Sequence, residues 1–335
     1  MYKNDFSGWI KLVFILVLLF FVSCVRKADK TEAEKYIKAC DAELSLHARN
    51  ISESSGFKEL LSFYSLPESP LPFRLSNRVY EQGFTGYDLA KASGNYLFVN
   101  DSSHWIRDIA QADSLPLCLT RYNRKGEKIE FHLNAYDEEV SALQMVIPTF
   151  YLASIWRDGH ELANFRYECT LLEGFPKAAW LKMKIADYHM QFELVSKFTS
   201  RSSADLDILL NILRENKPVV SISLSTKASF TENGTLTYSK IRGLARIFPL
   251  EIRLKSKNTG FPEGEHFIED WNRSSSLNVY AQDGVFLGKI KLVRNREVDR
   301  LGLSMQYTDG SSDDLDKILL VVKEILNVKM HRFHP

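Results

Sequence analysis

The feature that most constrains the fold is an alternation of apolar and polar residues that begins at about Gly86. Four clear examples are residues 129–133, 180–185, 220–225 and 289–292. Alternation with a period of two places the apolar side chains of a strand on one face and the polar ones on the other, which is typical of antiparallel sheets with one face in water. Turn dipeptides lie between such segments, namely Asp158-Gly159, Asn233-Gly234 and Asp283-Gly284. The last two of these dipeptides are strong hairpin signals, so the chain is predicted to be rich in antiparallel sheet.

The chain before this region has a helical pattern. Residues 31–34 read as a capping box, in which Thr31 begins a helix and Glu34 closes the motif. Apolar residues then recur at helical spacing as far as Ala48, and a second short helix is predicted over 57–63. The prolines at 67–72 end the pattern, because proline removes a backbone donor and disfavours helix in the residue before it. We therefore expect a helical lead-in over residues 31–72.

An internal repeat suggests how the rest is organised. Residues 198–210 align without a gap with residues 307–319, and both copies contain a Ser-Ser pair followed by aspartates and leucines. A serine is a good helix N-cap, and acidic residues are favoured in the first turn. Each copy is predicted to be a hairpin followed by a capped helix, the second helix running over 315–328. The expected fold class is α+β: a curved antiparallel β-sheet with helices packed on one face, an internally duplicated hairpin–helix unit and a helical N-terminal lead-in. The β-rich halves are expected at 73–216 and 217–335, each ending in a helix.

The first 24 residues indicate how the chain is attached. Lys3 and Lys11 flank the beginning of an apolar run, Leu12 to Val22, which is shorter than the roughly 20 residues needed to span a bilayer. Ser23-Cys24 ends this run and resembles the lipobox of bacterial lipoprotein precursors. The resemblance implies a signal peptide over 1–23, a diacylglycerol-modified Cys24 with further acylation such as palmitate, and a tether over 24–30. Val25, which is not aspartate, implies retention in the outer membrane, on its periplasmic or surface face. The rest of the chain resembles no family that we identify.

The composition argues against nucleic acid as a partner and leaves open whether two of the cysteines form a disulfide. Residues 1–23 hold two of the 43 basic and one of the 42 acidic residues, so the remaining chain carries 41 of each. A balanced chain has no basic excess for nucleic acid. With Cys24 acylated, Cys40, Cys118 and Cys169 remain, so at least one thiol must be free. Because the sequence has no CxxC motif, we expect these three cysteines to be small buried apolar residues, although two of the three could form a disulfide.

Known catalytic, nucleotide-binding and metal-binding motifs are absent from the sequence or incomplete. The sequence has no GxSxG, P-loop, GxGxxG or CxxC motif. His160-Glu161 begins a helical zinc motif, but Asn164 stands where the second histidine is required. The paired aspartates at 205 and 207, and at 314 and 316, fit helix caps better than calcium ligands, because no calcium-loop pattern surrounds them. We therefore expect no catalytic residue, metal or cofactor.

Two tryptophans beside turn signals, Trp156 and Trp180, are the only nominated ligand-binding residues. The first functional hypothesis is a non-enzymatic, membrane-anchored cell-envelope lipoprotein, held in the bilayer by acylated Cys24, that binds a lipid-like apolar ligand or an envelope protein. A surface component that binds glycans or serves in assembly is the alternative, and a hydrolase with an unrecognised site is the third.

Overall fold

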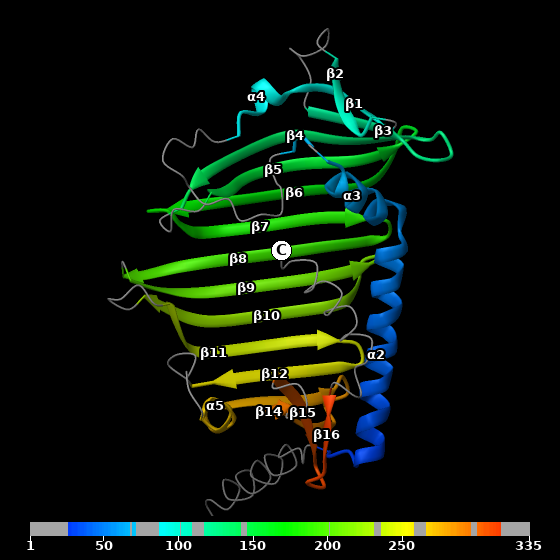
Figure 1. Ribbon diagram of the computed structural model, residues 1–335. Helices are drawn as coiled ribbons and strands as arrows, with labels where there is room; N and C mark the ends of the chain where they lie inside the picture. Colours follow the sequence, from blue (N-terminus) through cyan, green and yellow to red (C-terminus); the bar gives the residue numbers. More distant parts are fainter. Residues whose placement is uncertain are drawn as a thin grey trace, which may run out of the picture.

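One long, open β-sheet dominates the structure, which is a computed structural model (Figure 1). The structure describes residues 26–67, 69–71, 87–100, 102–108, 117–141, 146–200, 202–230, 236–257, 266–295 and 300–315. Within these residues the sheet has 16 strands. Every strand from β3 to β15 pairs antiparallel with the next in sequence, and β1 lies between β2 and β3, parallel to β3. The predicted antiparallel sheet is therefore confirmed, with one parallel pair at its edge.

The strands are short at the two ends of the sheet and long in its middle. They are β1 (Gly94–Val99), β2 (His104–Asp108), β3 (Leu117–Tyr122), β4 (Lys128–Val140), β5 (Val146–Arg157), β6 (His160–Leu172), β7 (Phe175–Ile185), β8 (Tyr188–Ser200), β9 (Ser203–Arg214), β10 (Lys217–Phe230), β11 (Leu236–Ile247), β12 (Leu250–Ser256), β13 (Ser275–Ala281), β14 (Phe286–Asn295), β15 (Arg300–Tyr307) and β16 (Ser312–Asp314).

Two-residue turns with positive φ angles join several of these strands. Asp158 and Gly159, between β5 and β6, have φ angles of 46° and 80°, and Glu215 and Asn216 between β9 and β10 have 49° and 65°. Positive φ at both central positions is the requirement of the type I′ turn, whose twist matches that of the flanking strands. The turn predicted at Asp158-Gly159 is confirmed, as is the hairpin predicted at Asp283-Gly284 between β13 and β14. Residues 233 and 234 lie outside the described residues.

The described helices are α2 (Lys30–Glu53), α3 (Ser55–Ser65), α4 (Leu89–Ala92) and α5 (Phe267–Ser274). The first two form the predicted helical lead-in, but the expected capping box at Thr31 is wrong. Asp29 is the N-cap of α2, and its side chain accepts a hydrogen bond from the backbone N–H of Glu32 at 2.8 Å. An aspartate oxygen in this position satisfies one of the free N–H groups at the helix start, which leaves Thr31 inside the first turn.

Helix α2 crosses the strands near one set of turns and bridges most of the sheet (Figure 1). Just before the helix, Ala28 donates a backbone hydrogen bond to Phe286 on β14, and near its other end His47 bonds to Tyr188 on β8. A rise of 1.5 Å per residue carries the chain about 28 Å over these 19 positions. Six strand spacings of about 4.8 Å span about 29 Å. The helix length therefore matches the run of strands that it crosses.

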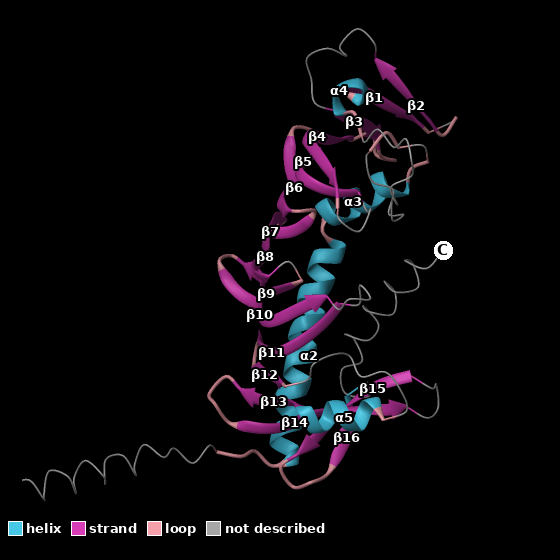
Figure 2. Ribbon diagram, turned by 90° about the vertical axis from the view of Figure 1, so that its left-hand side faces the viewer, coloured by secondary structure: helices cyan, strands magenta, loops and turns pink. Residues whose placement is uncertain are grey.

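Two separate hydrophobic cores hold the ends of the sheet. The first lies between α3 and β3 to β7 and includes Phe63, Phe131 and Ile155, each completely buried. The second lies between the first half of α2 and β12 to β15 and includes Ile37, Leu287 and Met305. Figure 2 shows that both ends of the sheet curve toward the side on which α2 lies. This side is the concave face, and both cores lie on it.

The expected duplication with helices on one face is wrong. The first predicted helix is strand β9, which pairs with β8 and β10 on both sides. In the second copy Ser312–Asp314 is strand β16, and the predicted helix from residue 316 onward lies outside the described residues. The error at β9 has a physical cause. Leu206, Leu209, Leu210 and Leu213 recur at helical spacing, but the same segment also alternates, and pairing on both edges decides in favour of strand.

Candidate functional site

The middle of the concave face carries apolar side chains that belong to neither core. We call this set the central apolar face. Its members are Met190, Phe192 and Leu194 on β8, Ile208, Leu210 and Ile212 on β9, and Ile222 and Leu224 on β10. Leu210 lies directly opposite Phe192 on one side and Ile222 on the other, and residues paired in this way point to the same face of a sheet.

The central apolar face is partly exposed and is longer than it is wide. All eight of its side chains are partly exposed, whereas equally apolar residues in the two cores are buried. Apolar residues continue on the same face to either side of these three strands. They are Leu181 on β7, Ile252 on β12 and Leu277 on β13. Six strand spacings give this band a length of about 29 Å, and three alternate residues give it a width of about 14 Å. The footprint of this band is roughly 400 Å², within the range of about 300–600 Å² for the largest apolar patch of a monomeric protein, and patches of that size are often functional.

Polar groups border the band on both sides. Beyond Leu194 and Leu224, the next inward-facing positions on β8 and β10 are the buried Ser196 and Thr226. On the opposite side, a pocket of about 380 Å³ lies between α2 and the turns of the sheet. Its lining residues are Glu43, Leu44, His47, Arg214, Glu215, Lys217, Pro218, Val219, Ile247 and Phe248. The lining thus combines charged groups with apolar ones, among which Phe248 is 53% exposed.

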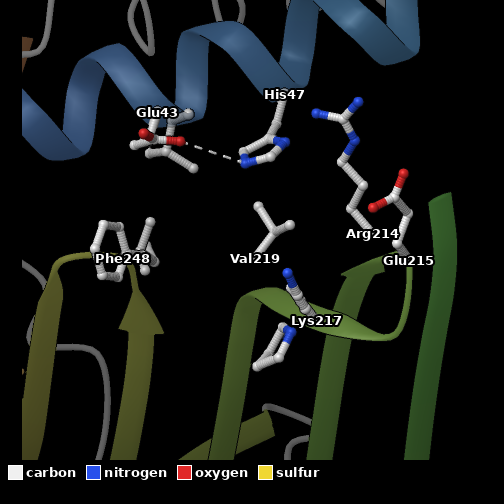
Figure 3. A pocket seen from close by; sticks show the side chains of 10 residues that line it. Glu43, His47, Arg214, Glu215, Lys217, Val219 and Phe248 are labelled. Carbon is white, nitrogen blue, oxygen red and sulfur yellow. Dashed lines mark ion pairs between the residues drawn. The ribbon is translucent and has the colours of Figure 1, made fainter. Parts of the chain in front are cut away.

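Helix α2 and the turn after β9 supply the charged groups of this pocket (Figure 3). His47 Nδ1 lies 2.8 Å from the hydroxyl of Tyr188, which is fully buried, and His47 Nε2 lies 3.6 Å from Glu43. Arg214 donates to Asp187 at 2.6 Å, and its guanidinium lies over the Tyr188 ring. The pocket is thus framed by an aromatic ring, an imidazole and one ion pair.

Burial and neighbouring charges set the protonation states here. Burial lowers the pKa of His47; the Glu43 carboxylate raises it, and the Arg214 cation lowers it further. The imidazole is therefore neutral at pH 7. The hydrogen bond from Arg214 holds the pKa of the Asp187 carboxyl below its usual value. No serine, threonine or cysteine is among the residues that line the pocket, so its described lining offers a place for a polar group and no hydroxyl or thiol nucleophile.

The residues nominated from the sequence lie elsewhere. Cys24 is outside the described residues. Trp156 and Trp180 lie on the opposite face of the sheet from the cores, on β5 and β7. Arg166 and Lys182 lie over the Trp180 ring at 5.1 and 5.3 Å from its centre. The structure therefore does not bring the two tryptophans to the concave face.

The three other cysteines are free thiols. Cys40 and Cys169 are buried, and burial raises the pKa of the Cys40 thiol to about 12. Cys118 lies on β3 beside Glu130 and His132 of β4, on the face opposite the first core. Burial raises the pKa of Cys118 and lowers that of His132, so both groups are neutral at pH 7.

Sequence reasoning missed the central apolar face because it assigned residues 203–210 to a helix. The available signal was the alternation of Leu206, Ile208, Leu210 and Ile212, which continues on β8 and β10. It also missed the group around Cys118, because only the register of β3 against β4 makes Cys118 and His132 neighbours.

None of the helices in the described part of the chain is both long enough and apolar enough to cross a membrane. Comparison with protein-family models, with curated proteins and with solved structures finds no match to this chain.

Proposed function

We propose that this protein is a non-enzymatic, membrane-anchored lipoprotein of the bacterial cell envelope that binds an acyl lipid on the central apolar face. The observation that carries the proposal is the band of partly exposed apolar side chains between the two buried cores. The band keeps its apolar character over about 29 Å, although neither core includes its central strands. Ligand sites for apolar molecules are concave, mostly apolar and bordered by a few polar groups, and this face has all three features.

The dimensions of the band suit an acyl lipid, and the aromatic platforms that a glycan would use lie on the other face. Each leaflet of a bilayer has about 15 Å of hydrocarbon, half of a core of about 30 Å, and the band is about 14 Å wide. A lipid tail lying across the band would cover its three rows of side chains. The pocket beside α2, whose lining holds the cations Arg214 and Lys217 together with Glu43 and Glu215, would then hold the polar head group. For a glycan, the candidate platforms are Trp156 and Trp180, and cations already lie over the second of these rings.

Attachment at Cys24, as the lipobox resemblance implies, is part of the same proposal. Each buried methylene contributes about 0.8 kcal/mol to membrane affinity, and stable anchoring takes at least two acyl chains. An acylated Cys24 would supply these chains and hold the sheet beside the outer membrane, within reach of lipid. The tether to the folded part is short, because residues 27 and 28 already pair with Phe286 on β14.

The test is to purify the full chain in mild detergent and to measure bound lipid by native mass spectrometry and by lipid extraction. Leu210→Lys places a charge at the centre of the central apolar face. Losing contact with about three methylenes at about 0.8 kcal/mol each would weaken lipid retention by roughly 50-fold. The matched control is Leu209→Lys, at the next position on β9, which points to the opposite face and lies opposite Glu193.

Lipid retained by the native chain and by Leu209→Lys, but lost from Leu210→Lys, is the expected result. Covalently attached acyl groups change the mass of the polypeptide itself and are thereby distinguished from bound lipid. A native chain without bound lipid in repeated preparations would contradict the proposal. Equal retention by the two lysine variants would also contradict it, because binding would then not involve the concave face.

A further inference from the structure

Three side chains with different metal-binding atoms meet on the outer face of β3 and β4. Cys118 lies directly opposite His132 in the antiparallel pair, and Thr120 lies opposite Glu130. The neighbouring residues Leu119, Phe131 and Leu133 point into the first core, so these polar residues point away from it. One donor atom each from Cys118, Glu130 and His132 lies within 4.8 Å of the other two.

These donors converge on one point. The thiol of Cys118 lies 4.0 Å from Oε1 of Glu130, and Nε2 of His132 lies 3.9 Å from the same oxygen. In a nucleophilic triad the carboxylate would instead hold the imidazole nitrogen that faces away from the thiol. The shared oxygen therefore fits a common ligand better than a proton relay.

The imidazole of His132 has one nitrogen without a hydrogen-bond partner among the described residues. Nε2 of His132 is buried and makes no hydrogen bond within the described residues. At 3.9 Å, Glu130 is too far to accept one. The Trp156 ring stacks on His132 and fixes the orientation of the imidazole. A buried nitrogen without a partner is costly, so a bound ion at this position would remove an existing penalty.

We propose that Cys118, Glu130 and His132 bind a divalent metal ion of the zinc class. Thiolate sulfur, imidazole nitrogen and carboxylate oxygen are the donors that Zn²⁺ prefers, with bonds of about 2.0–2.3 Å. Such bonds require donor separations of about 3.3–3.7 Å, so the side chains must approach one another by up to about 1 Å from their separations of at most 4.8 Å. Binding would form a bond from the sulfur to the metal and release the thiol proton to solvent. This site is on the opposite face from the central apolar face and does not depend on the proposed function.

Three protein ligands leave a fourth position for water or for another molecule. A shallow hollow of about 670 Å³ lies beside the site, over β1 to β4, and Cys118 and Glu130 are part of its lining. Leu97 and Ile106 are 40% and 50% exposed at the same hollow. The metal would therefore be open to exogenous ligands on this side.

Lys128 would compete with the metal for the carboxylate of Glu130. Its ammonium lies 2.7 Å from the same Oε1 of Glu130, and its side chain is 45% exposed. An incoming cation must displace this ammonium, and the exposed side chain can turn into solvent. Removing the charge should therefore strengthen metal binding, an effect that a merely structural cluster would not produce.

The experiment titrates the full chain in detergent with Zn²⁺ and with Co²⁺. A 1:1 complex with a thiolate-to-cobalt charge-transfer band is expected. Cys118→Ser and His132→Gln should each weaken binding at least tenfold and abolish or shift that band, whereas Lys128→Gln should strengthen binding several-fold. Zn²⁺ should also protect Cys118 from alkylation, as read by mass spectrometry.

The matched controls are His189→Gln, an exposed histidine of β8, and Cys169→Ala, a buried thiol outside the cluster. Both should bind as the native chain does. Circular dichroism of each variant separates loss of a ligand from loss of the fold. The absence of 1:1 binding in the native chain would overturn the proposal. It would also be overturned if Cys118→Ser left the cobalt spectrum unchanged, or if Lys128→Gln bound no more tightly than the native chain.

Discussion

Replacing Tyr188 by phenylalanine tests how α2 is held on the sheet. The Tyr188 hydroxyl lies at the point where α2 crosses β8, 2.8 Å from His47 Nδ1 and 3.3 Å from Asn50 Nδ2, and the residue is completely buried. Tyr188→Phe keeps the ring but leaves the imidazole nitrogen without its partner. An unsatisfied buried polar group costs about 1–3 kcal/mol. The amide of Asn50 is partly exposed and can bond to water, so we expect a loss of about 1–2 kcal/mol.

The assay is urea unfolding of the chain from Val25 onward, which contains every residue that the structure describes. The free energy of unfolding is obtained by linear extrapolation, and an unchanged slope would show that the folded and unfolded states expose the same surface as before. Tyr122→Phe is the matched control, because this tyrosine is 47% exposed and its hydroxyl can bond to water. Its expected change is within about 0.5 kcal/mol, as for other surface substitutions.

A double-mutant cycle makes the prediction specific. Combining Tyr188→Phe with His47→Gln should give a coupling energy of about 0.5–1.5 kcal/mol, because the two residues share one hydrogen bond. If Tyr188→Phe changed stability no more than Tyr122→Phe does, the hydroxyl would not contribute to docking of the helix. A coupling energy of zero would likewise refute the role given to this pair.

Two further predictions concern the same helix and the anchor. Burial lowers the pKa of His47 in the folded state below its value in the unfolded chain. The folded protein therefore binds fewer protons than the unfolded chain. The free energy of unfolding should be at its full value above about pH 6.5 and should fall as the pH decreases below that value. Urea unfolding between pH 8 and 5 should show a smaller loss for His47→Gln than for the native chain; an equal loss would assign the effect to other groups. The charged residues that face this imidazole are Glu43, Asp187 and Arg214. Cys24→Ala should abolish labelling by a fatty-acid tracer and release the chain from membranes, and persistent labelling would show that Cys24 is not the acylation site.

Local sequence was enough to predict the elements whose hydrogen bonds and contacts form between residues close together in the chain. The turn at Asp158-Gly159 could be predicted because a type I′ turn needs two residues that tolerate positive φ. The helical lead-in could be predicted because its apolar residues share one helix face and prolines follow it. The error at its start was small, since Asp29 and Thr31 are both good N-cap residues and only the backbone path selects between them.

The candidate sites could not be found in this way. Cys118 and His132 are 14 residues apart and become neighbours only through the register of β3 against β4. A shift of one residue in that register would turn one strand over and separate them. The central apolar face required residues 203–214 to be a strand, and no local pattern decided between strand and helix there.

The sequence by itself determined that most of the chain forms strands with one apolar and one polar face, that turns lie at Asp158-Gly159 and Asp283-Gly284, and that helices precede the sheet. Only the tertiary structure decided that β9 is a strand, that the ends of the sheet curve toward α2, and that two cores leave an apolar band between them. The physical reason is the range of the interactions. Turns, caps and alternation act within a few residues. Strand register, sheet curvature and burial depend on partners far along the chain, and here those partners set the geometry of both candidate sites.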